Sequence, residues 1–163
     1  MLLIPVQALS TAANTLVSNL IGAGGVNGVM RLLKRIAKVS LVVVAICIVW
    51  MAFFPQMFLS VYTNDAGLIA ESVPSLYVIG VAMLVAAVAN IYFNGISGTG
   101  NTQAALWLES GTLVVYGVYV FVVGWWMQAP VSVCFTTEIV YYALLFITSL
   151  IYLKKANWQN KKI

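Results

Sequence analysis

The chain has 163 residues, of which 63% are hydrophobic and 7% are charged, and its formal net charge is +4 at pH 7. A soluble domain is about 45–50% apolar and about 25% charged, so a soluble fold of this length could not bury so much apolar surface. The composition predicts an all-α fold, a polytopic transmembrane helix bundle whose solvent is the lipid bilayer. The sequence has no His, and its two Cys residues lie within apolar segments without metal-ligand spacing.

Five apolar segments approach the length of about 20 residues that a transmembrane helix needs. We expect these spans over residues 2–21, 39–62, 73–97, 104–127 and 131–153, separated by turn-forming stretches. The first span is the most polar and contains Asn14. In the fourth span, Gly111, Gly117 and Gly124 predict close packing against a neighbouring helix.

The basic residues fall in two groups, one between the first two spans and one after the fifth. With five spans the two groups share one side of the membrane, and the positive-inside rule makes that side, and the C-terminus, cytoplasmic. Because these charges sit at membrane edges, we expect no nucleic-acid partner. The first span then begins outside, which we interpret as a sign of missing upstream helices. The eight basic residues are Arg31, Lys34, Arg35, Lys38, Lys154, Lys155, Lys161 and Lys162.

Residues 26–38 predict an amphipathic helix that lies in the cytoplasmic interface. Its four basic residues occur at i, i+3, i+4 and i+7, so they share one helix face, and apolar residues occupy the other. We interpret this segment as a topology anchor. The alternative interpretation is a specific site for anionic lipid.

Two of the four acidic residues, Glu109 and Glu138, lie inside predicted spans. A carboxylate in hydrocarbon is costly unless it is paired, hydrated or protonated, and these spans contain no Lys or Arg. A proton, a bound cation or a water-filled cavity would each relieve that cost, and each suits a cation-coupled carrier. The alternative to a role in transport is that each acid lies close enough to the membrane interface to reach water.

The two acids are expected at opposite depths. At 1.5 Å per residue, Glu109 lies about 8 Å from the inner face and Glu138 about 10 Å from the outer face. In a core about 30 Å thick they are then about 12 Å apart along the membrane normal, so we expect them not to share one ion. Tyr141 and Tyr142 follow Glu138 at i+3 and i+4, so either could bond to it.

Amide side chains are the other candidates within the spans. Asn90 and Asn94 lie four residues apart on one face of the third span. Such amides, Asn14 included, either bond to neighbouring helices or line a cavity. No nucleophile–base pair, metal cluster or nucleotide site is visible in the sequence, so we expect no enzyme.

Three motifs carry a resemblance to a known family. They are LVSNLIGAG at residues 16–24, GISGTGNT at residues 95–102 and FTTEIVYY at residues 135–142. In this order and spacing the chain resembles the C-terminal half, about helices eight to twelve, of a bacterial multidrug and toxic compound extrusion (MATE) transporter. The resemblance implies that residues 1–163 form part of one lobe of a two-lobe transporter, whose N-terminal lobe is missing.

The resemblance also implies a function. Family members are antiporters that exchange sodium or protons for cationic drugs, so it implies small cationic or amphipathic substrates, a bacterial plasma (inner) membrane, and no cofactor beyond the coupling ion. Some sodium-coupled members place an acid on the tenth helix, where this chain has asparagines. The alternative is a truncated or standalone membrane protein that does not transport and only packs with partner helices. The candidate cation- or substrate-binding residues are Glu109, Glu138, Asn90, Asn94, Tyr141, Tyr142 and Asn14.

Overall fold

The computed structural model describes residues 4–61, 63, 65–126 and 131–155, which are almost entirely helical and contain no strand. The predicted all-α fold is confirmed. The elements are α1 (Ile4–Gly22), the short 3-10 helix η1 (Val26–Gly28), α2 (Val29–Phe53), α3 (Pro55–Leu59), α4 (Ala66–Gly98), α5 (Thr102–Phe121), the π-helical segment η2 (Val122–Trp126), α6 (Val131–Cys134) and α7 (Thr136–Lys155).

The number of spans agrees roughly with the five expected. Within the described residues, four helical stretches are long and apolar enough to cross a membrane: Val26–Phe53, Ala66–Gly98, Thr102–Trp125 and Thr136–Lys155. The fifth expected span is α1, which has 19 residues. α1 is long enough to cross a membrane, but its polar residues make it less apolar than the four helices above.

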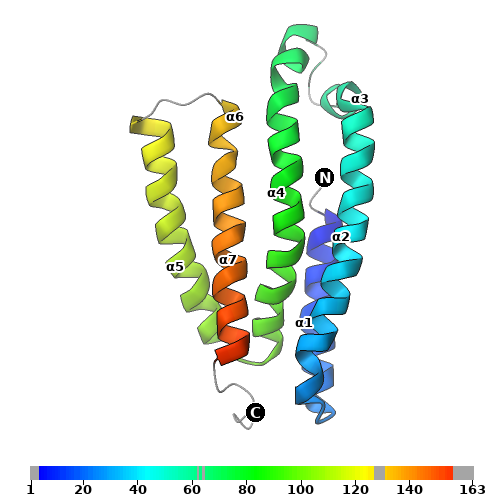
Figure 1. The fold of residues 1–163 in the computed structure, drawn as a ribbon, viewed down its shortest axis with the longest axis vertical. Coiled ribbons are helices and arrows are strands. Elements are labelled where there is room, and N and C mark those ends of the chain that lie inside the picture. Colours follow the sequence, from blue (N-terminus) through cyan, green and yellow to red (C-terminus); the bar gives the residue numbers. More distant parts are fainter. Residues whose placement is uncertain (1–3, 62, 64, 127–130, 156–163) are drawn as a thin grey trace.

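α4 is the central helix of the bundle. Figure 1 shows α1 and α2 on one side of it and α5 and α7 on the other, and α4 contacts all four. Its 33 residues extend about 50 Å, so its first turns project beyond the other helices (Figure 1). Asp65 caps this end, because its Oδ1 accepts hydrogen bonds from the backbone N–H groups of Gly67 at 2.8 Å and Leu68 at 3.4 Å.

The helices α1, α2 and α4 pack closely because α4 presents glycines to its neighbours. A Cβ atom added at Gly98 would lie 2.6 Å from the Asn14 carbonyl oxygen of α1, and Ser18 donates a hydrogen bond of 3.0 Å to the Gly98 carbonyl. Gly95 lies equally close to Leu33 of α2. The main buried core lies at this crossing.

The glycines predicted for close packing in the fourth span are not used in that way. A Cβ at Gly111, Gly117 or Gly124 would meet nothing within 4 Å, so that prediction is wrong. The sequence shows where glycines occur, and the rotation of the helix within the bundle decides whether a neighbour approaches them. The close approaches between helices are those of Gly80, Gly95 and Gly98 in α4.

The separate interfacial helix expected over residues 26–38 requires a correction. After the 3-10 turn η1, α2 runs without a break from Val29 to Phe53, so the basic segment forms the first turns of a membrane-spanning helix. The reason is that the buried face continues across the expected boundary: Val29, Leu33, Ala37, Ser40, Val44 and Met51 are all buried and fall at helical spacing.

Other span ends also differ from the expected ones. The second span ends at Phe53 because Phe54 leaves the helical region (φ −129°, ψ 55°) and Pro55 begins the short helix α3. The third span begins earlier, at Ala66, and the helix runs through Pro74. The expected ends at residues 2, 62 and 127, and the basic residues Lys161 and Lys162, lie outside the described residues.

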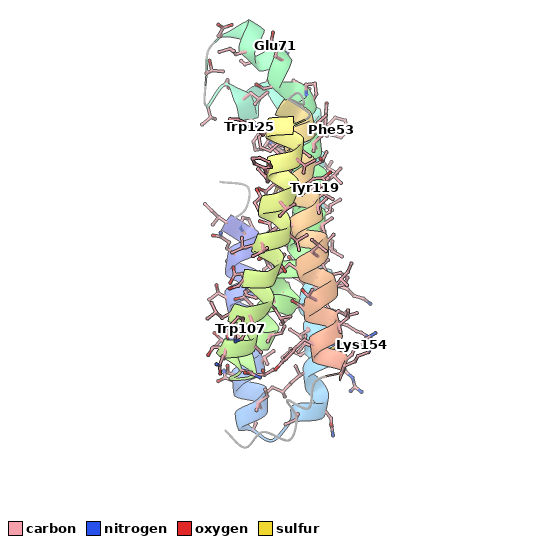
Figure 2. All side chains as sticks on the ribbon, turned by 90° about the vertical axis from the view of Figure 1, so that its left-hand side faces the viewer. Phe53, Glu71, Trp107, Tyr119, Trp125 and Lys154 are labelled. Carbon is pink, nitrogen blue, oxygen red and sulfur yellow. The ribbon has the colours of Figure 1, made fainter. Side chains whose placement is uncertain are left out.

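The described basic residues lie in the first turns of α2 and the last turn of α7, at one end of the bundle, which we call the basic end. The turn between α1 and α2 and the end of α7 both lie at this end (Figure 1). Figure 2 shows Lys154 and Trp107 toward this end and Glu71, Phe53 and Trp125 toward the opposite one.

Candidate functional site

Glu138 lies in the first turn of α7, at the end of the bundle opposite the basic end. The short helix α6 precedes it, and the Glu138 backbone N–H donates a hydrogen bond of 3.3 Å to the Phe135 carbonyl. A carboxylate in a first helical turn is favoured by the helix dipole. Its side chain is half-buried, and its Oε1 accepts a hydrogen bond of 3.3 Å from the Tyr116 hydroxyl of α5. That distance is long for an O–H···O hydrogen bond, so the carboxylate is held loosely.

Glu138 borders two pockets. One, of about 270 Å³, lies between α5–η2 and α6–α7, and its lining includes Tyr116, Gly124 and Phe135. The other, of about 440 Å³, lies between α4 and α7, with Met83, Phe135 and Tyr142 in its lining. The carboxylate and the Phe135 ring therefore stand between two spaces, each large enough for a hydrated ion or a small molecule.

Aromatic side chains surround this carboxylate. The rings of Tyr116 and Tyr141 meet edge to face with centroids 5.3 Å apart, and the rings of Tyr141 and Tyr142 meet in the same way at 5.1 Å. The Tyr142 hydroxyl also reaches the Asn90 side chain of α4. A connected group of polar and aromatic side chains thus crosses from α5 through α7 to α4.

Glu109 lies on α5 and is half-buried. It is seven residues before Tyr116, which places it about 10 Å along the helix from the Glu138 contact. Both carboxylates are near enough to Tyr141 to act on it electrostatically. The two acids are therefore separate positions with Tyr141 between them, rather than two ligands of one ion.

The asparagines have different surroundings. The Asn90 and Asn94 side chains are half-buried and donate hydrogen bonds of 3.0 Å to the carbonyls of Ala86 and Asn90 in their own helix. Asn14 is half-buried on α1, which packs on the other side of α4 from α7 (Figure 1). The structure thus joins Glu138, Tyr141, Tyr142 and Asn90, and it leaves Asn14 apart from them.

Tyr116 was absent from the candidates that sequence reasoning selected. The hydroxyl that bonds to Glu138 was expected from a tyrosine one turn along the same helix, and it comes from α5 instead. A signal was present, because Tyr116 follows Glu109 by seven residues and so shares its face of α5. The π-helical segment η2 was also missed. Such segments are frequent at functional sites, and its residues Val123 and Gly124 line the smaller pocket.

These features define a class: a polytopic membrane protein with acidic side chains inside its helix bundle. In the described residues no group of three or more His, Cys, Asp or Glu could hold a metal ion. The sequence model of the MatE family matches residues 1–126. The chain therefore belongs to the MatE family, whose members are membrane efflux transporters and not enzymes.

The family expected from the sequence motifs is confirmed. The matched residues cover α1 to η2 and end before α6 and α7, so Glu138, Tyr141 and Tyr142 lie beyond them. Searches of curated proteins and of solved structures found no match.

Proposed function

We propose that the chain is part of a secondary active antiporter that exports drugs or organic cations in exchange for sodium or protons. In this proposal the Glu138 carboxylate binds the coupling cation or the cationic substrate. The observation that carries it is a half-buried carboxylate that borders two pockets and has a tyrosine hydroxyl as its partner. The first basic residue after it on α7 is Lys154, 16 residues or about 24 Å along the helix.

The surroundings of Glu138 suit cations of two kinds. A proton or a sodium ion would neutralise the carboxylate directly, and the Tyr116 hydroxyl can supply a further oxygen. An organic cation would in addition contact the ring faces of Tyr116, Phe135 and Tyr142, because the face of an aromatic ring attracts a cation within about 6 Å. Glu109 is the second position in this proposal, linked to the first through Tyr141.

We further propose that the basic end faces the cytoplasm of a bacterial cell, as the positive-inside rule predicts, and that a missing N-terminal lobe covers α1. The support for a covering partner is the exposed polar face of that helix. Gln7, Thr11, Thr15 and Asn19 are exposed, and the Thr11 and Thr15 hydroxyls bond to carbonyls of their own helix at 3.0 and 3.3 Å. Such a face suits protein or a water-filled space better than lipid tails.

The test compares two acids of the same chain. The protein is expressed as its gene encodes it in cells that lack their own efflux pumps, and resistance to an organic cation such as ethidium is measured. Glu138→Gln keeps the side-chain volume and removes the charge, and it should abolish resistance at equal abundance in the membrane. Glu71→Gln is the matched control, because Glu71 is exposed at the far end of α4, and it should transport normally.

Normal resistance with Glu138→Gln would refute the assignment of the site. Transport in everted vesicles under a sodium gradient or a proton gradient identifies the coupling ion. If the unmodified chain inserts into the membrane and gives no transport in any of these assays, the alternative of a protein that only packs with partner helices is favoured.

A further inference from the structure

One exposed stripe runs along α2 and changes character on the way. It begins with Arg31, Lys34, Arg35 and Lys38, which are all exposed. At the same helical spacing it continues through Val42, Ile46, Val49 and Phe53, each more than half exposed. Because α2 is one unbroken helix, the basic third and the apolar two thirds lie on a single face.

The described helices that pack against α2 provide no acidic partner for the basic third. The four Lys and Arg residues occupy about 10 Å of helix. The helices that pack most closely against α2 are α1, α3 and α4. Their single acidic residue is Glu71, which lies at the opposite end of the bundle (Figure 2). Four like charges so close together favour an anionic ligand, and Arg in particular matches the geometry of phosphate oxygens.

The apolar part of the stripe contains a groove. A shallow pocket of about 400 Å³ is lined by Val42, Ala45, Ile46, Val49, Trp50, Phe53 and Phe54. The rings of Trp50 and Phe54 stand 5.4 Å apart at its far end. The groove begins four residues after Lys38 and extends about 18 Å along the helix, which is close to the thickness of one leaflet of a hydrocarbon core about 30 Å thick.

We propose that this stripe is a binding site for an anionic phospholipid, with the phosphate group against Arg31, Arg35 and Lys38 and one acyl chain in the groove. The order of the two parts, phosphate-binding and then apolar over one leaflet, is that of a phospholipid molecule. Long basic side chains at a helix end can reach from the helix to the head-group level. A topology anchor requires positive charge on one side of the membrane, and it requires neither a groove nor its alignment with the charges.

Trp50 provides the measurement because it lines the groove. The full chain is prepared with its other four tryptophans replaced by Phe, and circular dichroism verifies its helix content. It is placed in vesicles of phosphatidylcholine with increasing amounts of phosphatidylglycerol that carries brominated acyl chains, which quench Trp fluorescence on contact. Brominated phosphatidylcholine is the neutral comparison.

We expect brominated phosphatidylglycerol to quench Trp50 at a much lower fraction of the vesicle lipid than brominated phosphatidylcholine. Arg31→Gln with Arg35→Gln should weaken this preference by roughly tenfold or more. Lys154→Gln with Lys155→Gln is the matched control, because it removes two exposed charges at the same end of the bundle and leaves the stripe intact. This pair should keep the preference.

Three results would overturn the proposal. Equal quenching by the two lipids would show that the stripe has no preference for anionic lipid. If the two double variants lose the preference for phosphatidylglycerol equally, the preference reflects a general attraction of anionic lipid to positive surface charge. Displacement of the lipid by soluble glycerol phosphate at comparable concentration would show an anion site that does not use the groove.

Discussion

Replacing Gly98 with Ala tests whether close backbone approach holds α1 against α4. The added Cβ would lie 2.6 Å from the Asn14 carbonyl oxygen and 2.9 Å from the Val17 Cβ, whereas ordinary contacts begin at 3.4 Å. Relief of the closer contact needs a shift of about 0.8 Å, the difference between 3.4 and 2.6 Å. Neither neighbouring atom can rotate away, because one belongs to the backbone and the other is a Cβ.

Two unfavourable contributions and one favourable contribution set the expected change in the free energy of unfolding. Overpacking costs about 1–3 kcal/mol, and weakening of the bond from Ser18 to the Gly98 carbonyl costs about 1 kcal/mol. The higher helix propensity of Ala returns up to about 1 kcal/mol. We therefore expect Gly98→Ala to lower the free energy of unfolding by about 1–3 kcal/mol.

Gly80→Ala is the matched control within the same helix. Its Cβ would lie 2.8 Å from the Met51 Cε, the end of a flexible side chain that can move aside, so we expect a change below about 1 kcal/mol. Unfolding of each variant is followed by circular dichroism in detergent micelles with increasing dodecyl sulfate. If Gly98→Ala is as stable as Gly80→Ala, the close backbone approach does not hold the two helices together.

Three further predictions concern stability and access. Asn101→Ala should lower the free energy of unfolding by about 1–2 kcal/mol in the same assay, because Asn101 caps α5 and donates a hydrogen bond to the Tyr152 hydroxyl. Tyr152→Phe keeps the cap and should lower the free energy of unfolding by less. A larger decrease for Tyr152→Phe than for Asn101→Ala would contradict this prediction. Leu33→Ala should cost about 2–5 kcal/mol, because Leu33 is fully buried, and a cost below 1 kcal/mol would contradict its place in the core. Cys134 lines the pocket beside Glu138, so a bound organic cation should slow its reaction with maleimide and leave Cys47 of α2 unaffected; equal protection of the two would contradict a ligand at this pocket.

The helical bundle could be predicted from the sequence because long apolar segments have few folds available in a membrane. The start of the second span could not be predicted correctly, because the charged residues up to Lys38 were interpreted as lying outside the span. The buried stripe from Val29 through Leu33 and Ala37 to Val44 shows that the helix continues. The period of the buried face, followed across the charged residues, was the better guide.

The acidic residues of the candidate site could be predicted from the sequence, but the residues that contact them could not. Glu109 and Glu138 stand out because charged residues are rare within spans, and the spacing along each helix gives their separation. The partner of Glu138 depends on how α5 is rotated about its axis against α7, which is decided by side-chain packing between the two helices. Spacing along one chain segment identifies a face, as it does for Glu109 and Tyr116, and does not show what that face meets.

The position of α5 depends more on the contacts around Glu138 than the position of α4 does. In the most apolar 18-residue stretch of each helix, 11% of the α5 residues are buried, compared with 50% in α4. α4 is held by close contacts with α1 and α2, and a single hydrogen bond of about 1 kcal/mol adds little to them. For α5, which has much less buried surface, the contacts of Tyr116 with Glu138 and Tyr141 are a larger share of what fixes its position. A change in the charge of Glu138 therefore acts on the long helix that has the fewest buried residues.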